Sequence, residues 1–417
     1  MIRATSAALV TLLLCACGGS PADGNSEMVG NMAPPALGPD GKPFKVEVVG
    51  EFAEPFALTF LADGRALVTE KGGKLKLWQS GRPLIDIAGA PNVASVGQGG
   101  LLDVAVSPDF ATSRNIYLTF SEARPGGTNL ALARARLNLE SGAPRLEATQ
   151  VIWRAGSAGE GGHFGATMAF SPDGQHLFLT AGDRQRFAPA QDMNQRLGKI
   201  LRLTLDGKPA PGNPWEGKAG TPTVSVIDPP ENSGSAGKAK ARTVAVEGVN
   251  TAPAEIWSLG HRNPYGLAFA PDGRLWETEM GPKGGDELNL IEKGKNYGYP
   301  LVSNGQNYDD SDIPNHDTRP EFKAPAAYWD PSISPAGLIF YRGDLWPQWK
   351  GSAFLGALSG ESLIRVEVNG ATATKADRWD MGTRIRDVAE APDGSLFVLE
   401  DGGRGANGKL MRLTPAG

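Results

Sequence analysis

The sequence predicts an all-β protein, because its composition suits many tight turns and one strand–turn–strand pattern recurs along it. The 417-residue chain contains 55 glycines and 32 prolines and shows little helical periodicity. The recurring pattern is a short apolar strand, a Pro-Asp-Gly-like turn and a second apolar strand. Its copies lie at 60–69, 106–120, 170–180, 269–276, 339–344 and 391–399, the fifth being degenerate.

These turns have a definite chemistry. The proline presets φ, the aspartate side chain bonds back to the backbone, and the glycine accepts a positive φ. A Pro-Asp-Gly turn marks hairpins in any β protein, so one copy alone says little. Six ordered copies leave about 60 residues each, enough for a four-stranded blade with its loops, and radial repetition of blades makes a β-propeller. We therefore expect a six-bladed β-propeller over residues 44–417.

The N-terminus predicts export and lipidation. An apolar run at 4–14 follows Arg3 and is too short to span a bilayer, as in a signal peptide. Residues 14–18 (LCACG) resemble a bacterial lipobox with Cys17 as the lipidated residue; an ordinary secretory signal with incidental cysteines is the alternative. Residues 18–43 predict a flexible tether. The expected location is the bacterial envelope, facing the periplasm or exterior, on the outer membrane.

The net charge, the positions of the cysteines and the spacing of the copies limit what else the chain can contain. The formal net charge is -5 and the basic residues are scattered, which argues against nucleic acid as a partner. Both cysteines lie in the signal segment, so the mature protein would have no internal disulfide. The longest interval between copies holds a stretch at 225–254 rich in Gly, Ala, Ser and Lys. This stretch predicts a mobile loop on the functional face, with no chemistry assigned.

Only four histidines can supply a base that titrates near neutral pH. His176 lies inside a strand pattern and is interpreted as structural, and His316 in a polar loop is expected to be solvated. His261 would brace a compact polar turn. His163 follows a Gly-Glu-Gly-Gly loop and precedes a strand, so its imidazole is expected on the loop face. His163 is therefore the candidate catalytic base, with a structural role left open.

Arginines form the second candidate cluster. Arg262, Arg384 and Arg386 each precede a Pro-Asp-Gly strand pair. Along an extended segment, alternation would put Arg384 and Arg386 on one side. Two convergent arginines suit a polycarboxylate or phosphate, whereas salt bridges that lock blades together fit equally well. The corner at Gly281 and Pro282 exposes carbonyls that a hard cation can use.

A series of short motifs completes the sequence evidence. In chain order they are GQGGLLDVA (97–105), HFG (163–165), GDR (182–184), AQD (190–192), GKILR (198–202), GHRNP (260–264), EMGP (279–282), GGDE (284–287), NYG (296–298), WDPSI (329–333) and RIRD (384–387). Together they resemble the soluble PQQ-dependent aldose sugar dehydrogenases, also called glucose/sorbosone dehydrogenases. The resemblance covers about residues 52–415.

The resemblance implies a quinoprotein that oxidises the anomeric carbon of aldose sugars to lactones, with hydride transfer to pyrroloquinoline quinone (PQQ). By matching position, His163 would take the proton from the anomeric hydroxyl. The implied cofactor-binding residues are Gln98, Arg262, Asn263, Tyr308, Leu358, Ser359, Arg384, Ile385 and Arg386. Calcium would be held by Gly281 and Pro282, and a second, structural calcium by Glu287 and Tyr297. A soluble or membrane electron acceptor would be the partner.

The sequence departs from the family pattern at three positions: Thr167 and Ser359 stand where an arginine and often a lysine are expected, and Met280 replaces a histidine. Losing the cation at 359 weakens the attraction for a tricarboxylate cofactor. Two other functions stay open. One is a non-catalytic, surface-anchored binding propeller; the other is a calcium-dependent lactonase, which would need carboxylates and asparagine converging on a central metal.

Overall fold

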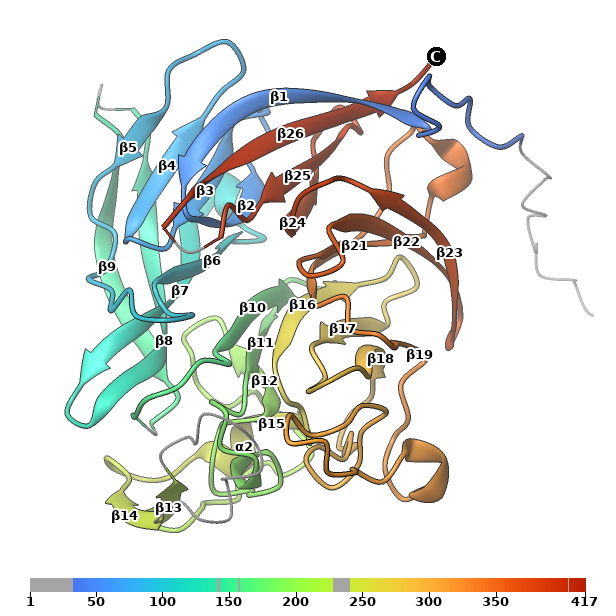
Figure 1. Ribbon diagram of the computed structural model, residues 1–417. Coiled ribbons are helices and arrows are strands. Elements are labelled where there is room, and N and C mark those ends of the chain that lie inside the picture. The colour runs from blue at the N-terminus through green and yellow to red at the C-terminus, as the bar shows by residue number, and fades with distance from the viewer. Residues whose placement is uncertain (1–32, 141–142, 157, 228–240, 404) are drawn as a thin grey trace, which may run out of the picture. The chain divides into compact units, whose positions relative to one another are not determined.

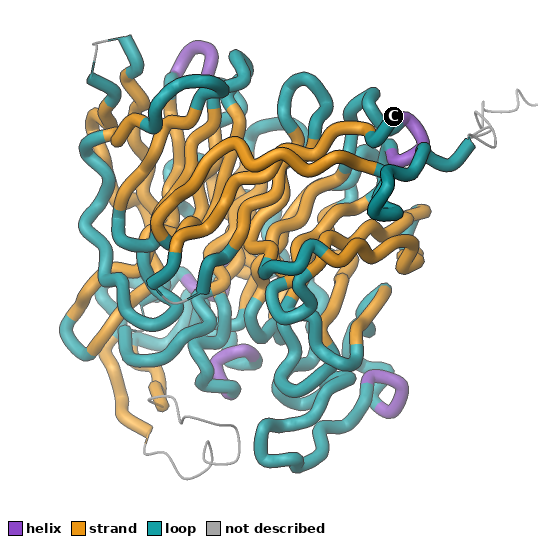
Figure 2. Tube along the Cα trace, turned by 45° about the horizontal axis from the view of Figure 1, so that its top comes forward, coloured by secondary structure: helices purple, strands orange, loops and turns teal. Residues whose placement is uncertain are grey.

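The computed structural model describes residues 33–417 except 141–142, 157, 228–240 and 404. Within these residues, strands form six four-stranded antiparallel sheets and one two-stranded hairpin (Figure 1). In the part of the chain that the structure describes, helices are limited to short turns among the strands (Figure 2). These are α1 (Phe110–Ser113), α2 (Ala252–Glu255) and the 3-10 turns Ala188–Ala190, His316–Thr318 and Pro347–Trp349.

The sheets are the blades of a propeller, and the strands of each run in order from the innermost to the outermost. Blade 1 contains β2 (Pro55–Phe60), β3 (Ala66–Glu70), β4 (Lys74–Trp78) and β5 (Ile85–Ile87). Blade 2 contains β6 (Leu101–Val106), β7 (Asn115–Arg124), β8 (Gly127–Asn138) and β9 (Arg145–Arg154). Blade 3 contains β10 (Gly165–Phe170), β11 (His176–Ala181), β12 (Lys199–Thr204) and β15 (Ile256–Leu259).

The second half continues the same order. Blade 4 contains β16 (Pro264–Phe269), β17 (Leu275–Glu279), β18 (Asp286–Ile291) and β19 (Ala327–Trp329). Blade 5 contains β20 (Pro335–Phe340), β21 (Ala353–Ala357), β22 (Ser362–Asn369) and β23 (Thr372–Asp380). Blade 6 contains β24 (Ile385–Glu390), β25 (Leu396–Glu400), β26 (Asn407–Pro415) and β1 (Phe44–Ala53).

The ring is closed by pairing the two ends of the propeller sequence. Strand β1 pairs antiparallel with β26, from Phe44 opposite Pro415 to Ala53 opposite Asn407. The innermost strand of blade 1 also contacts the innermost strand of blade 6. The six-bladed propeller predicted from the sequence is thus confirmed.

All six predicted turn positions fall in the first hairpin of a blade. In four of them the aspartate Oδ1 accepts the backbone N–H two residues later, at 3.0–3.1 Å; these are Asp63, Asp173, Asp272 and Asp393. At Asp109 the hairpin widens into α1, and Oδ1 accepts the hydroxyls of Ser107 and Ser113. The turn chemistry inferred from the sequence therefore sets the register of the blades.

Neighbouring blades are held together by apolar side chains on their facing surfaces. Between blades 4 and 5, for example, Trp276 and Leu288 pack with Phe340 and Leu355, all buried. Burying each such side chain contributes about 1.5–3 kcal/mol relative to leaving it exposed. This packing gives the rigid scaffold from which the loops project.

Each innermost strand is irregular near its first residues. The register shifts lie between Pro55 and Leu58, Leu101 and Val104, Gly165 and Met168, Pro264 and Gly266, Ala336 and Leu338, and Ile385 and Asp387. A bulge bends its strand and re-aims nearby side chains. In an antiparallel blade, the start of the first strand and the end of the second lie at the same edge. One face of the ring therefore gathers the residues before β10 and β16 with those after β11, β17 and β21.

The expectation of a loop at 225–254 is wrong for part of that stretch. Strands β13 (Thr223–Ile227) and β14 (Ala241–Ala245) pair antiparallel, and α2 follows. The reason is a short alternation in which Val224 and Val226 are buried while Thr223 and Ser225 are exposed. So brief a period-2 signal is hard to separate from loop composition.

The signal peptide predicted at 1–17, with Cys17, lies outside the described residues. Of the tether predicted at 18–43, residues 33–43 are described, and they include a turn in which Gly38 N–H donates to Lys42 O at 2.7 Å. Strand β1 begins at Phe44, directly after it. No helix in the described part of the chain is long and apolar enough to cross a membrane.

Candidate active site

His163 lies immediately before β10, on the face of the ring where the first strands of the blades begin. Its backbone φ is +50°, and its side chain is 8% exposed. The backbone N–H donates to Gln98 Oε1 at 2.7 Å. A Cβ at Gly162 would lie 2.6 Å from Gln98 Cδ, so glycine is needed for this approach. The glycine-rich loop thus lets the side chain of Gln98, from the loop before blade 2, fix the backbone of the histidine.

A buried carboxylate orients the imidazole. His163 Nδ1 lies 2.7 Å from Asp183 Oδ1, and Asp183 follows the end of β11. The Asp183 carboxylate also accepts the backbone N–H groups of Gln185 and Phe187, at 2.9 and 3.1 Å. Because an ionised carboxylate can only accept, Nδ1 carries the proton and Nε2 keeps its lone pair.

The surroundings keep this pair in the ionisation state that a base requires. Burial, followed by the nearby Arg262 guanidinium, lowers the pKa of His163 against the opposing effect of Asp183. Burial raises the pKa of Asp183, but the contacts with His163 and Arg262 lower it overall. A neutral imidazole beside an ionised carboxylate can accept a proton at neutral pH.

His163 opens onto a cavity of about 1110 Å³. This exceeds the ~300–1,000 Å³ of typical ligand pockets, so there is room for two small molecules side by side. The predicted residues that line the cavity are His163, Gln98, Arg262, Asn263, Gly281, Pro282, Tyr308 and Ser359. They come from loops of several blades, and the fold alone brings them together.

Arg262 supplies a positive charge to this cavity. Its Nη1 donates to the carbonyls of Met280 and Gly281 at 2.9 and 2.6 Å, and Nη2 donates to the Tyr308 hydroxyl at 3.2 Å. Its guanidinium lies 5.9 Å and 5.7 Å from the ring centroids of Tyr299 and Tyr308. Within the described chain, the buried Nε has no hydrogen-bond partner and no carboxylate forms an ion pair with this arginine. The site therefore suits an anionic, planar ligand.

The corner after β17 offers main-chain oxygens. A Cβ at Gly281 would lie 2.3 Å from Gly284 O, so only glycine fits this bend. The Gly281 N–H donates to the buried Asp286 at 2.8 Å. Since Gly281 O already accepts from Arg262, one of its two lone pairs is left for a cation, beside the neighbouring carbonyl of Pro282.

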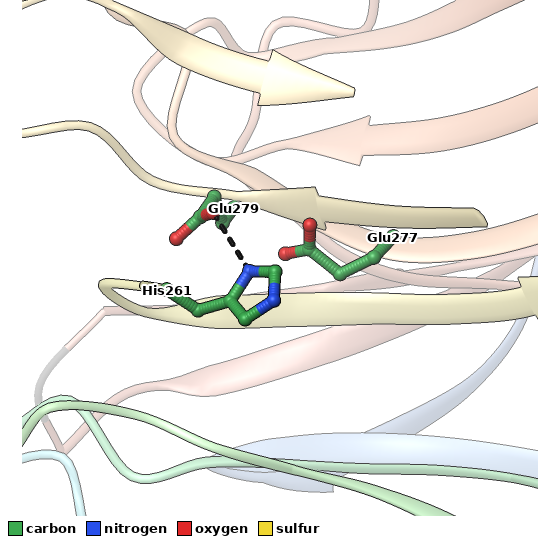
Figure 3. A group of neighbouring side chains, drawn as sticks. All are labelled: His261, Glu277 and Glu279. Atoms are coloured by element: carbon green, nitrogen blue, oxygen red, sulfur yellow. Dashed lines mark hydrogen bonds and ion pairs between the residues drawn. The ribbon is translucent and has the colours of Figure 1, made fainter. Parts of the chain in front are cut away.

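A second group of potential metal ligands is buried inside blade 4 (Figure 3). The ligand atoms of His261, Glu277 and Glu279 lie within 4.8 Å of one another. The Asn289 amide donates to Glu277, Glu279 and Glu287 at 3.2, 3.4 and 3.0 Å. Glu277 Oε1 and Asn289 Oδ1 are buried without a hydrogen-bond partner in the described structure. Clustered carboxyl and amide oxygens fit a hard cation such as calcium.

The two residues predicted for the second calcium lie at this group. Glu287 Oε1 is 3.4 Å from His316 Nε2, and burial raises the pKa of Glu287. The Tyr297 ring stacks on His261, with centroids 4.7 Å apart, and its hydroxyl donates to Leu290 O. Because this hydroxyl also accepts the Glu292 N–H at 3.0 Å, any metal contact from Tyr297 would use its main-chain oxygen. The cavity beside Glu279 and Glu287 is about 10 Å³, too small for a lactone, so these carboxylates do not support a lactonase.

Arg384 and Arg386 lie on one side of their segment, as alternation predicted. Both reach Asp401 Oδ2, at 3.4 Å and 2.6 Å. Neither lines the His163 cavity. Arg386 instead lies 5.6 Å from the ring centroid of Tyr265, whose hydroxyl donates to Gln98 Oε1 at 3.3 Å. Arg386 thus connects with the cavity through two side chains, and its role toward a cofactor stays a prediction.

Leu358 and Ile385 are core residues in this structure. They are 2% and 0% exposed, and both side chains pack in hydrophobic clusters. The Leu358 N–H donates to Ser334 O at 2.9 Å. Their side chains can position a site but offer a ligand no hydrogen bond.

The expectation that His316 is solvated is wrong. The residue is 6% exposed and lies against Glu287, because the loop at 303–316 folds back over the Gly281–Gly285 corner. Two backbone hydrogen bonds between Lys283 and Gln306, of 2.9 and 3.0 Å, fasten this loop. A polar composition did not reveal that long-range pairing.

The three departures from the family pattern lie in different places. Thr167 lines a central channel of about 730 Å³ together with Asp103 and Asp387, outside the His163 cavity. Met280 and Ser359 line the His163 cavity itself. Ser359 Oγ is 2.8 Å from Ser334 Oγ. A cation is thus absent from the position where the resemblance leads one to expect it.

Sequence reasoning assigned no role to Asp183 or Tyr265. Asp183 belongs to the GDR motif, which directly follows a strand. A polar residue at the end of a strand indicates a candidate site residue. Tyr265 stands inside the apolar β16 and gave no such signal.

Comparison with known proteins assigns this chain to the sugar dehydrogenases. Residues 52–225 and 235–412 match the family model described as glucose/sorbosone dehydrogenase. The aldose sugar dehydrogenase YliI of Escherichia coli is 37% identical, over 87% of this chain and 90% of that protein. The chain therefore belongs to the glucose/sorbosone dehydrogenase family. The names of its relatives indicate that the protein is an oxidoreductase.

Solved structures agree with this family assignment. The apo-form of the soluble aldose sugar dehydrogenase from Escherichia coli superposes with a TM-score of 0.75 at 36% identity, covering 89% of this chain and 99% of that one. The PQQ-bound form of an aldose sugar dehydrogenase from Streptomyces coelicolor gives a TM-score of 0.67 at 25% identity, covering 90% and 100%. The resemblance inferred from the motifs is thereby confirmed.

Proposed function

We propose that the protein is a PQQ-dependent aldose sugar dehydrogenase that oxidises the anomeric carbon of an aldose to a lactone. The observation that carries this is the cavity shared by the oriented His163 and the buried, charged Arg262. One group can accept a proton while the other attracts an anionic quinone. The PQQ-bound relative from Streptomyces coelicolor supports the choice of cofactor.

The residues of the cavity fit a tricarboxylate quinone. Arg262, with its unpartnered Nε, and Asn263 would face the quinone, and Gln98 and Tyr308 would contact its edges. Arg384 and Arg386 pair with Asp401 outside this cavity, and contacts from them to the carboxylates of the cofactor remain a prediction. When bound, PQQ would supply the hydride acceptor that no side chain can provide.

The protein's own part in the reaction is proton transfer and orientation. A sugar in the cavity would present its anomeric hydroxyl to His163 Nε2, the nitrogen that keeps a lone pair. As the proton arrives, the Asp183 carboxylate stabilises the imidazolium across a separation of 2.7 Å. Asp183 is fully buried, and the low dielectric around it strengthens this interaction. Removing the hydroxyl proton favours loss of the anomeric hydrogen as hydride.

Calcium is proposed at two places. The carbonyls of Gly281 and Pro282 would hold one ion at the cavity, where a cation would polarise the cofactor. The buried carboxylates around Asn289, including that of Glu287, would hold a structural ion inside blade 4 together with the main-chain oxygen of Tyr297.

The function is tested by reconstitution. Apo-protein is incubated with PQQ and calcium and assayed with an artificial electron acceptor against a panel of mono- and disaccharides. PQQ-dependent reduction of the acceptor with aldoses supports the proposal. No binding of PQQ in the presence of calcium, followed by absorbance, would favour a non-catalytic binding propeller instead.

We further propose that Cys17 is lipidated and anchors the mature protein at the envelope, where a soluble or membrane electron acceptor would take the electrons. The lipobox-like residues 14–18 are the basis for this. Cys17→Ser should release the protein from the membrane fraction. An unchanged membrane fraction would refute lipidation.

A further inference from the structure

Arg184 is a buried cation that the proposed reaction does not use. It is 1% exposed and does not line the His163 cavity. Its Nη2 donates to Gly161 O at 2.7 Å, its Nε to Gly162 O at 2.9 Å, and its Nη1 to Thr128 O at 3.0 Å. Nη2 also lies within 3.2 Å of the Thr128 hydroxyl and of Gly159 O. All these acceptors are neutral, so the arginine serves geometry rather than charge pairing.

These acceptors belong mostly to one segment, the glycine-rich loop that ends at His163. Four consecutive carbonyls, those of residues 159–162, turn toward one guanidinium. Three of these four residues are glycines, which have no side chain to hold the loop and gain much freedom when unrestrained. The fork of a guanidinium is rigid and presents five N–H groups, which suits it to fix several carbonyls at once.

The same arginine is joined to the histidine through backbone and ring contacts. Its N–H donates to His163 O at 3.3 Å, and its guanidinium lies 3.9 Å from the ring centroid of Phe164. Both His163 and Arg184 have positive φ, +50° and +57°. Residues with a Cβ adopt this conformation at a cost of order 1–3 kcal/mol, and only when the surroundings impose it. The carbonyl contacts of Arg184, together with the hydrogen bond from the His163 N–H to Gln98, hold this segment in that conformation.

The charge of Arg184 also acts on the imidazole. Burial and the neighbouring Arg186 lower the pKa of Arg184 to about 9, so it stays protonated at neutral pH. The charged groups that face His163 are Asp183, which favours the imidazolium, and Arg262 and Arg184, which disfavour it. Arg184 is therefore one of two cations that keep the base neutral.

We propose that Arg184 is a positioning residue for the base: it holds the loop at 159–162 so that His163 keeps its imidazole on Asp183 and its Nε2 toward the cavity. The proposal rests on the proposed role of His163 in the reaction. Arg184 touches neither sugar nor cofactor, and it acts through the loop.

The direct test is histidine NMR on the full-length apo-protein, which needs no activity. The chain has four histidines, so the spectrum of His163→Ala identifies the signals of His163. In the wild type we expect one fixed tautomer, protonated at Nδ1. Arg184→Lys, which keeps the charge but loses the fork, should show tautomer averaging. Arg184→Met should show averaging and a higher His163 pKa.

Kinetics give the second readout. With PQQ bound, Arg184→Lys should lower kcat by about 10²-fold with little change in the KM for sugar, because a displacement of about 1 Å of a catalytic group costs this much. The acid limb of the kcat/KM profile should move to higher pH in Arg184→Met and stay in place in Arg184→Lys. Arg365→Lys, at a mostly buried arginine of blade 5 paired with Asp377, is the matched control and should leave His163 unchanged.

Thr128→Val covers the case in which Arg184→Met fails to fold. It removes one acceptor, the Thr128 hydroxyl, and should give a smaller change in the same direction. The proposal is overturned if Arg184→Lys and Thr128→Val both leave the tautomer of His163 as in the wild type. Failure of the dehydrogenase assay in the wild type would instead refute the proposed function, while the NMR result would still decide the positioning role.

Discussion

The Nδ1 atom of His163 lies 2.7 Å from Oδ1 of Asp183, and the carboxylate is fully buried. The histidine precedes β10 and the aspartate follows β11, so the two ends of one hairpin edge supply a base and its orienting group. This pair fixes which imidazole nitrogen can accept a proton. The proposed chemistry depends on it.

Asp183→Asn should lower kcat by roughly 10²–10⁴-fold, the usual contribution of a general base. An amide presents N–H groups where the carboxylate only accepts, so the imidazole would take the tautomer protonated at Nε2. Steady-state kinetics at equal PQQ occupancy measure the effect. Asp206→Asn is the control, because that side chain is 71% exposed in a turn of blade 3. Full activity in Asp183→Asn would contradict the assigned role.

The pH dependence of activity follows from the direction of the histidine shift. The neutral imidazole is the active form, and burial with Arg262 lowers the pKa of His163 below its ordinary 6.5. Activity should therefore persist as the pH falls to 6.5 and be lost only at lower pH. The acid limb of log kcat/KM against pH in the free enzyme reports this pKa. A limb centred above pH 6.5 would show that the shift has the opposite sign.

Ser359→Lys should tighten PQQ binding by about tenfold, equivalent to ~1.4 kcal/mol. Ser359 lines the same cavity as Arg262, and a lysine there would add a cation facing a tricarboxylate. Titration of the apo-protein with PQQ, followed by absorbance, gives the Kd. Ser359→Met matches the length without the charge, and equal affinities in the two variants would mean that charge at this position has no effect.

Calcium should stabilise the protein through the group of buried carboxylates in blade 4. An ion that binds only the folded state raises the free energy of unfolding by about 2.7 kcal/mol at a hundred times its Kd. Thermal unfolding with calcium and with a chelator measures this increment. Glu287→Gln should shrink it, whereas Glu367→Gln, at a 60% exposed side chain, should not. The same increment in both variants would argue against an ion at Glu287.

The fold was accessible from the sequence because its turns carry local chemistry. Asp63, Asp173, Asp272 and Asp393 each form the side-chain-to-backbone bond that their Pro-Asp-Gly or Ala-Asp-Gly context predicts. Six hairpins of the same kind along one chain then leave few alternatives to a ring of blades. Local signals of this kind do not depend on distant contacts.

Only part of the candidate site could be predicted from the sequence. Residues at strand ends, such as His163 and Arg262, carry a recognisable position, and the structure brings both to one cavity. The burial of His316 depends on a contact with Glu287, which lies more than twenty residues away in the chain. The position of Arg386 beside the ring of Tyr265 depends on contact between blades that are distant in the chain. Such contacts arise from ring closure, and no local pattern encodes them.

The role of His163 as the base is tested most directly by comparing wild type with His163→Ala, both loaded with PQQ and calcium to the same occupancy measured by absorbance. The reduction rate of an artificial acceptor by an aldose is recorded for each. We expect kcat to fall roughly 10²–10⁴-fold while PQQ remains bound. An unchanged kcat in His163→Ala would contradict this role, because the base would then have to be another group.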